Sequence, residues 1–203
     1  MNSTTSLLTD RFFDALTFAA KLHNNQLRKG TQIPYVTHLM AVAGLVLEHG
    51  GNENEAIAGL LHDAIEDQAE HNGGAEVLRS EISNRFGAEV LSIVEGCTDA
   101  DTFPKPPWRA RKQAYIDHLA EASRSVLRVS CADKVHNART LLVDYREQGE
   151  ATWYRFNAGR DETLWYYASL IDVFKKAGAP GTLVKELDRV VDELTRLVMN
   201  QQC

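Results

Sequence analysis

The chain has 203 residues, of which 44% are hydrophobic, and this suffices for one compact domain with its own core. A net charge of −6 argues against the broad basic surface of a nucleic-acid-binding protein. The first ten residues lack the pattern of a signal peptide, and no apolar stretch is long enough to span a bilayer. The three cysteines, Cys97, Cys131 and Cys203, form no paired motif, which is typical of a reducing compartment. We therefore expect a cytoplasmic protein without a membrane or nucleic-acid partner.

Apolar residues recur at helical spacing along almost the whole chain. In chain order, the expected helices cover residues 12–23, 36–49, 53–67, 77–86, 88–96, 108–122, 125–145, 156–177 and 183–198. Glycines and prolines separate them, with Gly87 as a hinge and Pro107 suited to a first helical turn. Asn52 or Asn54 is a candidate N-cap for the third helix. The sequence therefore predicts an all-α fold in a single domain.

Four ionisable side chains interrupt an apolar stretch in the helix expected over 53–67. They are His62, Asp63, Glu66 and Asp67. On a continuous helix His62 and Glu66 share one face, and Asp63 and Asp67 share the neighbouring face. Burying such groups without partners costs several kcal/mol per ion. A bound cation would remove this cost.

Two further residues complete a candidate ligand set. His38 lies early in the helix expected over 36–49, 24 positions before His62, and Asp133 lies within the helix over 125–145, 70 positions after Asp63. Two imidazoles and two carboxylates suit manganese, iron or zinc with positions left open for water, which is typical of catalysis. Each residue alone has a simpler explanation, such as a core histidine or an Asp133 paired with Lys134. The ordered combination favours a metal site.

This ordered pattern resembles the HD superfamily of metal-dependent phosphohydrolases. More narrowly, the chain is similar over about residues 15–170 to the hydrolase domain of the Rel/Spo proteins and to the Mesh-type small alarmone hydrolases. The segments that match are Arg28-Lys29-Gly30 with Pro34-Tyr35-Val36-Thr37-His38, then His62-Asp63-Ala64-Ile65-Glu66-Asp67, Cys97-Thr98-Asp99, and Ala132-Asp133-Lys134-Val135-His136-Asn137.

The resemblance implies one HD-type helical bundle over residues 1–203, with a core of about 15–170 and a C-terminal helix over 183–198. It implies one divalent cation, usually Mn²⁺, and removal of the 3′-pyrophosphate from guanosine tetra- or pentaphosphate (ppGpp or pppGpp). The implied ligands are His38, His62, Asp63 and Asp133. The implied catalytic residues are Glu66, Asp67 and Asn137, and Arg28 and Lys29 are expected at the substrate pocket. Of the two acidic residues, Glu66 is the better candidate for the general base, one turn after His62.

Other interpretations stay open at this point. An HD nucleotidase acting on another phosphorylated nucleotide would share the four ligands, and a non-catalytic HD module could bind a nucleotide as a sensor. A dinuclear phosphodiesterase is disfavoured, because only His71 and His118 lie between His62 and the Ala132–Asn137 segment. The sequence does not choose between guanine and adenine alarmones, and it leaves a homo-oligomer open.

Two stretches match nothing in the long bifunctional relatives, namely 104–112 and 153–167. Basic residues gather in the first stretch and again between 139 and 160. For each of them ordinary surface charge is the better interpretation: Lys105, Arg109, Arg111, Lys112, Arg139, Arg146, Arg155 and Arg160. Aromatic residues near the motifs, such as Tyr35, Trp153, Tyr154 and Tyr166, could stack on a purine, although for most of them core packing is the simpler role.

Overall fold

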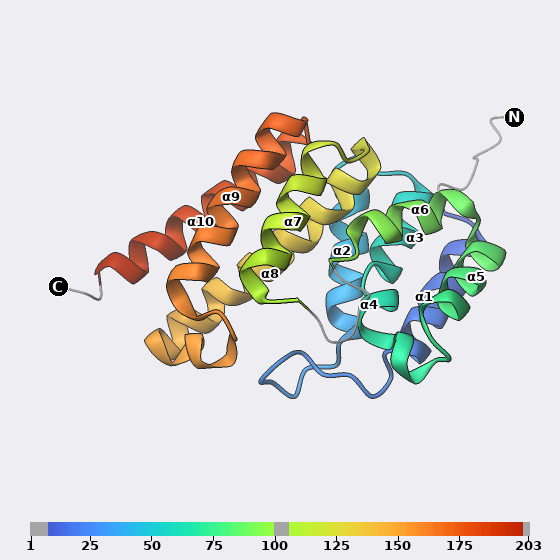
Figure 1. The fold of residues 1–203 in the computed structure, drawn as a ribbon, viewed down its shortest axis with the longest axis horizontal. Coiled ribbons are helices and arrows are strands. Elements are labelled where there is room, and N and C mark those ends of the chain that lie inside the picture. Colours follow the sequence, from blue (N-terminus) through green and yellow to red (C-terminus); the bar gives the residue numbers. More distant parts are fainter. Residues whose placement is uncertain (1–7, 100–105, 201–203) are drawn as a thin grey trace, which may run out of the picture. The chain divides into compact units, whose positions relative to one another are not determined.

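A computed structural model describes residues 8–99 and 106–200, and the chain divides into two compact units after residue 101 (Figure 1). Within the described residues the regular structure is helical, apart from one isolated antiparallel bridge between Leu27 and Pro34. The predicted all-α class is confirmed. The single-domain boundaries 1–203 remain a prediction. Within the same residues no helix is long and apolar enough to cross a membrane.

The first unit is built around a short buried helix, α3. α3 packs against α1, α2 and α6, and its residues Ile57, Leu60 and Leu61 are almost wholly buried. Asn52 caps it, because its side chain accepts from the amide of Glu55 while the Glu55 carboxylate accepts from the amide of Asn52. The elements of this unit are α1 (Asp10–Leu22), α2 (Val36–Glu48), α3 (Glu53–Leu61), α4 (Ala64–Gln68), a 3₁₀ turn η1 (Ala69–His71), α5 (Ala75–Phe86) and α6 (Ala88–Cys97).

The helix predicted over 53–67 is in fact two helices, and the break falls on the His62-Asp63 pair. His62 Nδ1 lies 2.9 Å from the carbonyl oxygen of Gly59, which is the acceptor that the Asp63 amide would use in a continuous helix. Asp63 then takes φ −97° and ψ 0°, a conformation common among active-site residues. The prediction of one continuous helix was wrong, because a side chain competes with the backbone for that carbonyl.

The second unit follows the predicted helices more closely. Its elements are α7 (Trp108–Ala120), α8 (Arg124–Gln148), a 3₁₀ segment η2 (Gly149–Arg155), α9 (Gly159–Ala177) and α10 (Gly181–Asn200). α10 packs against α8 and α9, and α7 packs against α9. The helix predicted over 156–177 starts later, at Gly159, because η2 precedes it. Gly149 ends α8 with φ 58°, and the hydroxyl of Thr152 donates to the carbonyl of Asp144, so η2 is held against α8.

Candidate metal centre

Three of the predicted ligands meet in the first unit. His38 in the first turn of α2 and His62 at the end of α3 are 1% and 2% exposed, and their rings lie edge to face with centroids 5.2 Å apart. The Oδ2 atom of Asp63 lies 3.0 Å from His62 Nε2 and 3.6 Å from His38 Nε2. Two imidazole nitrogens and a carboxylate oxygen thus converge in a largely buried place.

The hydrogen bonds of His62 show that this arrangement fits a cation. Because Nδ1 faces the carbonyl oxygen of Gly59, it must carry the proton, and in the neutral ring Nε2 then presents a lone pair. That lone pair faces the Asp63 carboxylate at 3.0 Å, so two acceptors oppose each other unless positive charge lies between or on them. A metal ion supplies such charge, and a backbone carbonyl that orients the second ring nitrogen is typical of metal-binding histidines.

Asp63 is also held by a residue from the segment before α2. The hydroxyl of Tyr35 donates to Asp63 Oδ2 at 2.5 Å, the distance expected of a hydroxyl bound to an ionised carboxylate. The Tyr35 ring lies nearly parallel to that of His23, with centroids 5.2 Å apart, and edge-on to that of His38. The sequence placed Tyr35 in a motif but did not indicate this contact.

The two predicted acidic residues of α4 have different partners. The backbone amide of Asp99, in the predicted Thr-Asp step, donates to Glu66 Oε2 at 3.3 Å. Asp67 Oδ2 instead accepts at 2.8 Å from the side-chain amide of Gln26. Gln26 Oε1 in turn lies 2.6 Å from His23 Nδ1 and 2.5 Å from Gln68 Nε2. Asp67 is therefore part of a polar network, which no sequence motif had indicated.

His23 belongs to the interior of this network. It is 2% exposed, and burial lowers its pKa, although its hydrogen bond to Gln26 and the charge of Asp63 act in the opposite direction. The Nδ1–H group donates to Gln26, and the buried Nε2 atom makes no hydrogen bond to a described residue. His23 is therefore a neutral side chain that supports its neighbours by packing and by one hydrogen bond.

The predicted substrate residues Arg28 and Lys29 lie on the loop between α1 and α2. The loop closes on itself, because the amide of Arg28 donates to the carbonyl of Ile33 at 2.8 Å and that of Tyr35 to the carbonyl of Gln26 at 2.9 Å. The guanidinium carbon of Arg28 lies 5.7 Å from the centroid of the Tyr35 ring. Lys29 is exposed. The basic pair thus stands on a hydrogen-bonded loop that also contains Tyr35.

The remaining predicted ligand, Asp133, lies in α8 of the second unit and is 6% exposed. Lys134 Nζ donates to its Oδ2 at 2.6 Å, and Asn137 Nδ2 donates to its Oδ1 at 2.5 Å. Burial would lower the pKa of Lys134, but Asp133, with Tyr166 and Tyr115, outweighs this and raises that pKa well above its usual range. Asp133 thus has a permanent cation beside it, and Asn137 orients the carboxylate.

Most of the other basic residues have acidic partners, and one of them, Arg155, is mostly buried with its partner Asp144 rather than a surface charge. Arg109 pairs with Glu162 at 2.9 Å, and its guanidinium carbon lies 3.2 Å from the Trp165 ring centroid. Carboxylates likewise pair with Arg139, Arg146, Arg155 and Arg160. Lys105 lies outside the described residues. His71 and His118 are exposed, which agrees with their exclusion as ligands.

Aromatic residues of the second unit divide between the core and the surface. Trp153 and Tyr166 are buried, as predicted for core packing, whereas Tyr154 is 89% exposed. Cys131 is also a core residue, fully buried, and this burial raises the pKa of its thiol to about 12.

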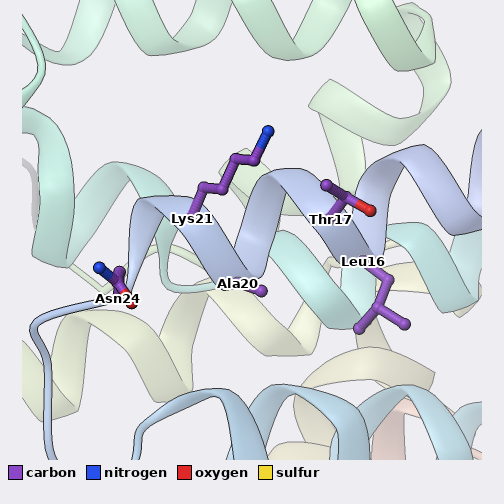
Figure 2. Close-up of a pocket in the computed structure, with 5 residues that line it drawn as sticks. All are labelled: Leu16, Thr17, Ala20, Lys21 and Asn24. Atoms are coloured by element: carbon purple, nitrogen blue, oxygen red, sulfur yellow. The ribbon is translucent and has the colours of Figure 1, made fainter.

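A surface pocket on the first unit lies on α1 and the residue that follows its end. Figure 2 shows its lining side chains, Leu16, Thr17, Ala20, Lys21 and Asn24. They include none of the predicted ligands or catalytic residues. The chemistry of the chain is therefore to be sought at the histidines and carboxylates and not in this pocket.

Comparisons with known proteins agree with the motif pattern. Residues 15–164 match the HD domain family. The MESH1 protein of Xenopus tropicalis, named a guanosine-3′,5′-bis(diphosphate) 3′-pyrophosphohydrolase, is 36% identical over 131 residues, or 63% of this chain and 68% of the relative. The human MESH1 protein is 32% identical over 134 residues, or 64% of this chain and 69% of the relative. A probable enzyme of the same activity from Synechocystis is 36% identical over 137 residues, but the match covers only 16% of that longer protein.

Solved structures give the same fold. A structure described as a metazoan ortholog of SpoT that hydrolyzes ppGpp has a TM-score of 0.73 at 24% identity, covering 91% of this chain and 96% of its own. The structure of lmo0812 from Listeria monocytogenes EGD-e has a TM-score of 0.64 at 26% identity, covering 76% and 96%. At these identities the likeness concerns the fold.

Proposed function

Because the chain belongs to the HD domain family and, within it, to the group of the MESH1 pyrophosphohydrolases, we propose that it removes the 3′-pyrophosphate of guanosine-3′,5′-bis(diphosphate) and of the corresponding pentaphosphate. The observation that best supports this is the convergence of His38, His62 and Asp63, with the lone pair of His62 Nε2 turned toward a carboxylate. A cation placed between these two acceptors would interact favourably with both.

The proposed cofactor is one divalent cation, Mn²⁺, with His38, His62, Asp63 and Asp133 as its ligands. His38, His62 and Asp133 are buried and each offers a ligand atom, and nitrogen and oxygen donors together suit this ion. When bound, the cation would lower the pKa of a water molecule and polarise a phosphoryl oxygen. Its identity as manganese rests on the family resemblance.

The protein side chains have separate roles in the proposed reaction. Glu66 takes a proton from the attacking water, since its half-buried carboxylate lies one helical turn after the proposed ligand His62. Asp67 and Asn137 orient neighbouring groups, Asp67 through Gln26 and Asn137 through Asp133. Arg28 and Lys29 provide positive charge for the phosphates of the substrate.

A direct assay tests the proposal. The protein is incubated with guanosine tetraphosphate and Mn²⁺, and the products are separated by anion-exchange chromatography. We expect guanosine diphosphate and pyrophosphate, and no products when the metal is chelated. Guanosine monophosphate and the adenine analogue of the tetraphosphate serve as comparison substrates. Hydrolysis of the monophosphate alone would indicate an HD nucleotidase, and tight binding without hydrolysis would indicate a sensor module.

We also propose that the protein acts in a reducing compartment such as the cytoplasm. Both described cysteines, Cys97 and Cys131, are buried free thiols, which is the state expected there.

A further inference from the structure

We propose that Tyr35 is a positioning residue that couples the loop bearing Arg28 and Lys29 to the ligand Asp63. This inference rests on the proposed function, because it assigns a role to a side chain that touches a proposed metal ligand. The loop between α1 and α2 and the acidic residues around α4 are far apart in sequence. Two side chains of the loop reach these acidic residues.

The first link runs through the hydroxyl of Tyr35, which donates to Asp63 Oδ2 at 2.5 Å. This is the same oxygen atom that lies near the Nε2 atoms of His62 and His38. A donor on a ligating carboxylate fixes its orientation, and loss of such a partner commonly weakens metal binding by about 10–100-fold. The hydroxyl is therefore expected to act on the affinity for the metal.

The second link runs through the ring of Tyr35, which lies near two other side chains. The His23 ring is stacked on it at 5.2 Å with planes 16° apart, and the Arg28 guanidinium carbon lies 5.7 Å from its centroid. The ring is thus in contact with a buried residue of the network and with one of the proposed phosphate ligands. Its removal is expected to loosen the loop that presents Arg28.

A parallel contact strengthens the coupling. Gln26, also on the loop, donates to Asp67, which lies four residues after Asp63. The backbone amide of Tyr35 donates to the carbonyl of Gln26 at 2.9 Å, so both side chains are fixed to the same part of the loop. The loop therefore holds both acidic residues, Asp63 by a hydroxyl and Asp67 by an amide.

Two substitutions of Tyr35 separate the roles of its hydroxyl and its ring. Tyr35→Phe removes the bond to Asp63 and keeps the stacking, so we expect Mn²⁺ affinity to fall by about 10-fold or more, with KM at saturating Mn²⁺ unchanged within about twofold. Tyr35→Leu removes both, so KM for the tetraphosphate should also rise severalfold. Tyr154→Phe, at a residue that is 89% exposed, is the matched control and should change neither quantity.

The measurements are calorimetric titration of the metal-free protein with Mn²⁺, steady-state kinetics at saturating Mn²⁺, and circular dichroism to verify folding. A folded Tyr35→Phe variant with wild-type Mn²⁺ affinity would overturn the inference, as would a Tyr35→Leu variant with wild-type KM. If the wild type binds Mn²⁺ but does not cleave the tetraphosphate, the proposed function fails. The Mn²⁺ titration of Tyr35→Phe then still decides whether the hydroxyl positions Asp63.

Discussion

Glu66 differs from the proposed ligands in its surroundings, and this difference allows chemistry to be separated from metal binding. It is half-buried, and its Oε2 atom accepts a hydrogen bond from the backbone amide of Asp99 at 3.3 Å. Glu66→Gln keeps its size and most of its hydrogen bonding but removes the base. We predict a rate lower by about 10²–10⁴-fold in single-turnover hydrolysis, with Mn²⁺ content unchanged.

The control for this variant is Glu70→Gln, an exposed residue one turn later, which should hydrolyse at the wild-type rate. A near-native rate in Glu66→Gln would refute its role as the base and direct attention to Asp67.

Asn137→Ala is expected to lower the hydrolysis rate less than Glu66→Gln does. It removes a neutral donor from the Asp133 carboxylate, and such a hydrogen bond is worth about 1.5–3 kcal/mol when one partner is charged.

His23 makes the stability of the protein depend on pH in a defined direction. Burial lowers its pKa in the folded chain, whereas in the unfolded chain it titrates near its ordinary value of about 6.5. Below that value the unfolded chain takes up a proton that the folded chain resists, so this contribution to stability is present above pH 6.5 and is lost as pH falls through the folded pKa.

We predict that His23→Gln flattens the fall in unfolding free energy between pH 6.5 and 5, because one titrating group is removed. The slope that one such group contributes is at most about 1.4 kcal/mol per pH unit. Urea unfolding of the wild type and of His23→Gln at several pH values measures the difference between the two slopes. The other titratable groups contribute equally to the slopes of both proteins. Identical slopes would show that folding does not lower the pKa of His23.

At the scale of single residues, the motif residues could be predicted from the sequence, whereas their partners could not. The donors to Asp63 and Asp67 come from Tyr35 and Gln26, whose side chains reach α4 only because of the path of the loop. Neither spacing nor hydrophobic pattern determines that path. The hydrogen bonds that the Asp133 carboxylate accepts within α8 were easier to predict, since the donors Lys134 and Asn137 are one and four positions away on the same helix.

At the scale of helices, periodicity located most elements but missed the break at His62. Apolar residues keep a spacing of about 3.6 residues through this segment. This spacing does not reveal the hydrogen bond from His62 Nδ1 to the carbonyl oxygen of Gly59, which competes with the helix. The 3₁₀ segment η2 was missed because it lies between the helices predicted over 125–145 and 156–177, and only Thr152 and Trp153 are buried there, too few to show a period.

Gly59 allows α2 and α3 to approach closely. A Cβ atom at this position would lie 3.2 Å from the Cα and 3.3 Å from the N atom of Ala43, which are backbone atoms that cannot turn aside. Gly59→Ala should therefore push the helices apart, lowering the free energy of unfolding by about 1–3 kcal/mol and weakening Mn²⁺ binding, because His38 and His62 lie on these two helices.

Gly44→Ala is the matched control, on α2, where a Cβ would meet nothing within 4 Å. It should be neutral or stabilising by up to about 1 kcal/mol, as for other helical glycines. Chemical denaturation and Mn²⁺ titration of both variants test the difference. Equal stability and equal affinity in the two variants would show that the close approach of α2 and α3 is unimportant.

At the scale of the whole molecule, the proposed ligands lie within the part of the chain that matches the HD domain family. The match runs over residues 15–164, and the proposed ligands run from His38 to Asp133. A cation that binds only the folded chain should stabilise it, and about one ion should bind per chain. A ligand that binds only the folded state at 100 times its dissociation constant adds about 2.7 kcal/mol to the free energy of unfolding.

For a chain of this length that free energy corresponds to a rise of about 5–11 °C in the melting temperature. We predict such a rise for the wild type when Mn²⁺ is added, and none for the double variant His62→Ala with Asp63→Ala or for the single variant Asp133→Asn. Elemental analysis after dialysis measures the metal content in parallel. Stoichiometric metal retained by the double variant would contradict the assignment of these ligands, and a full thermal shift in Asp133→Asn would remove Asp133 from the ligand set.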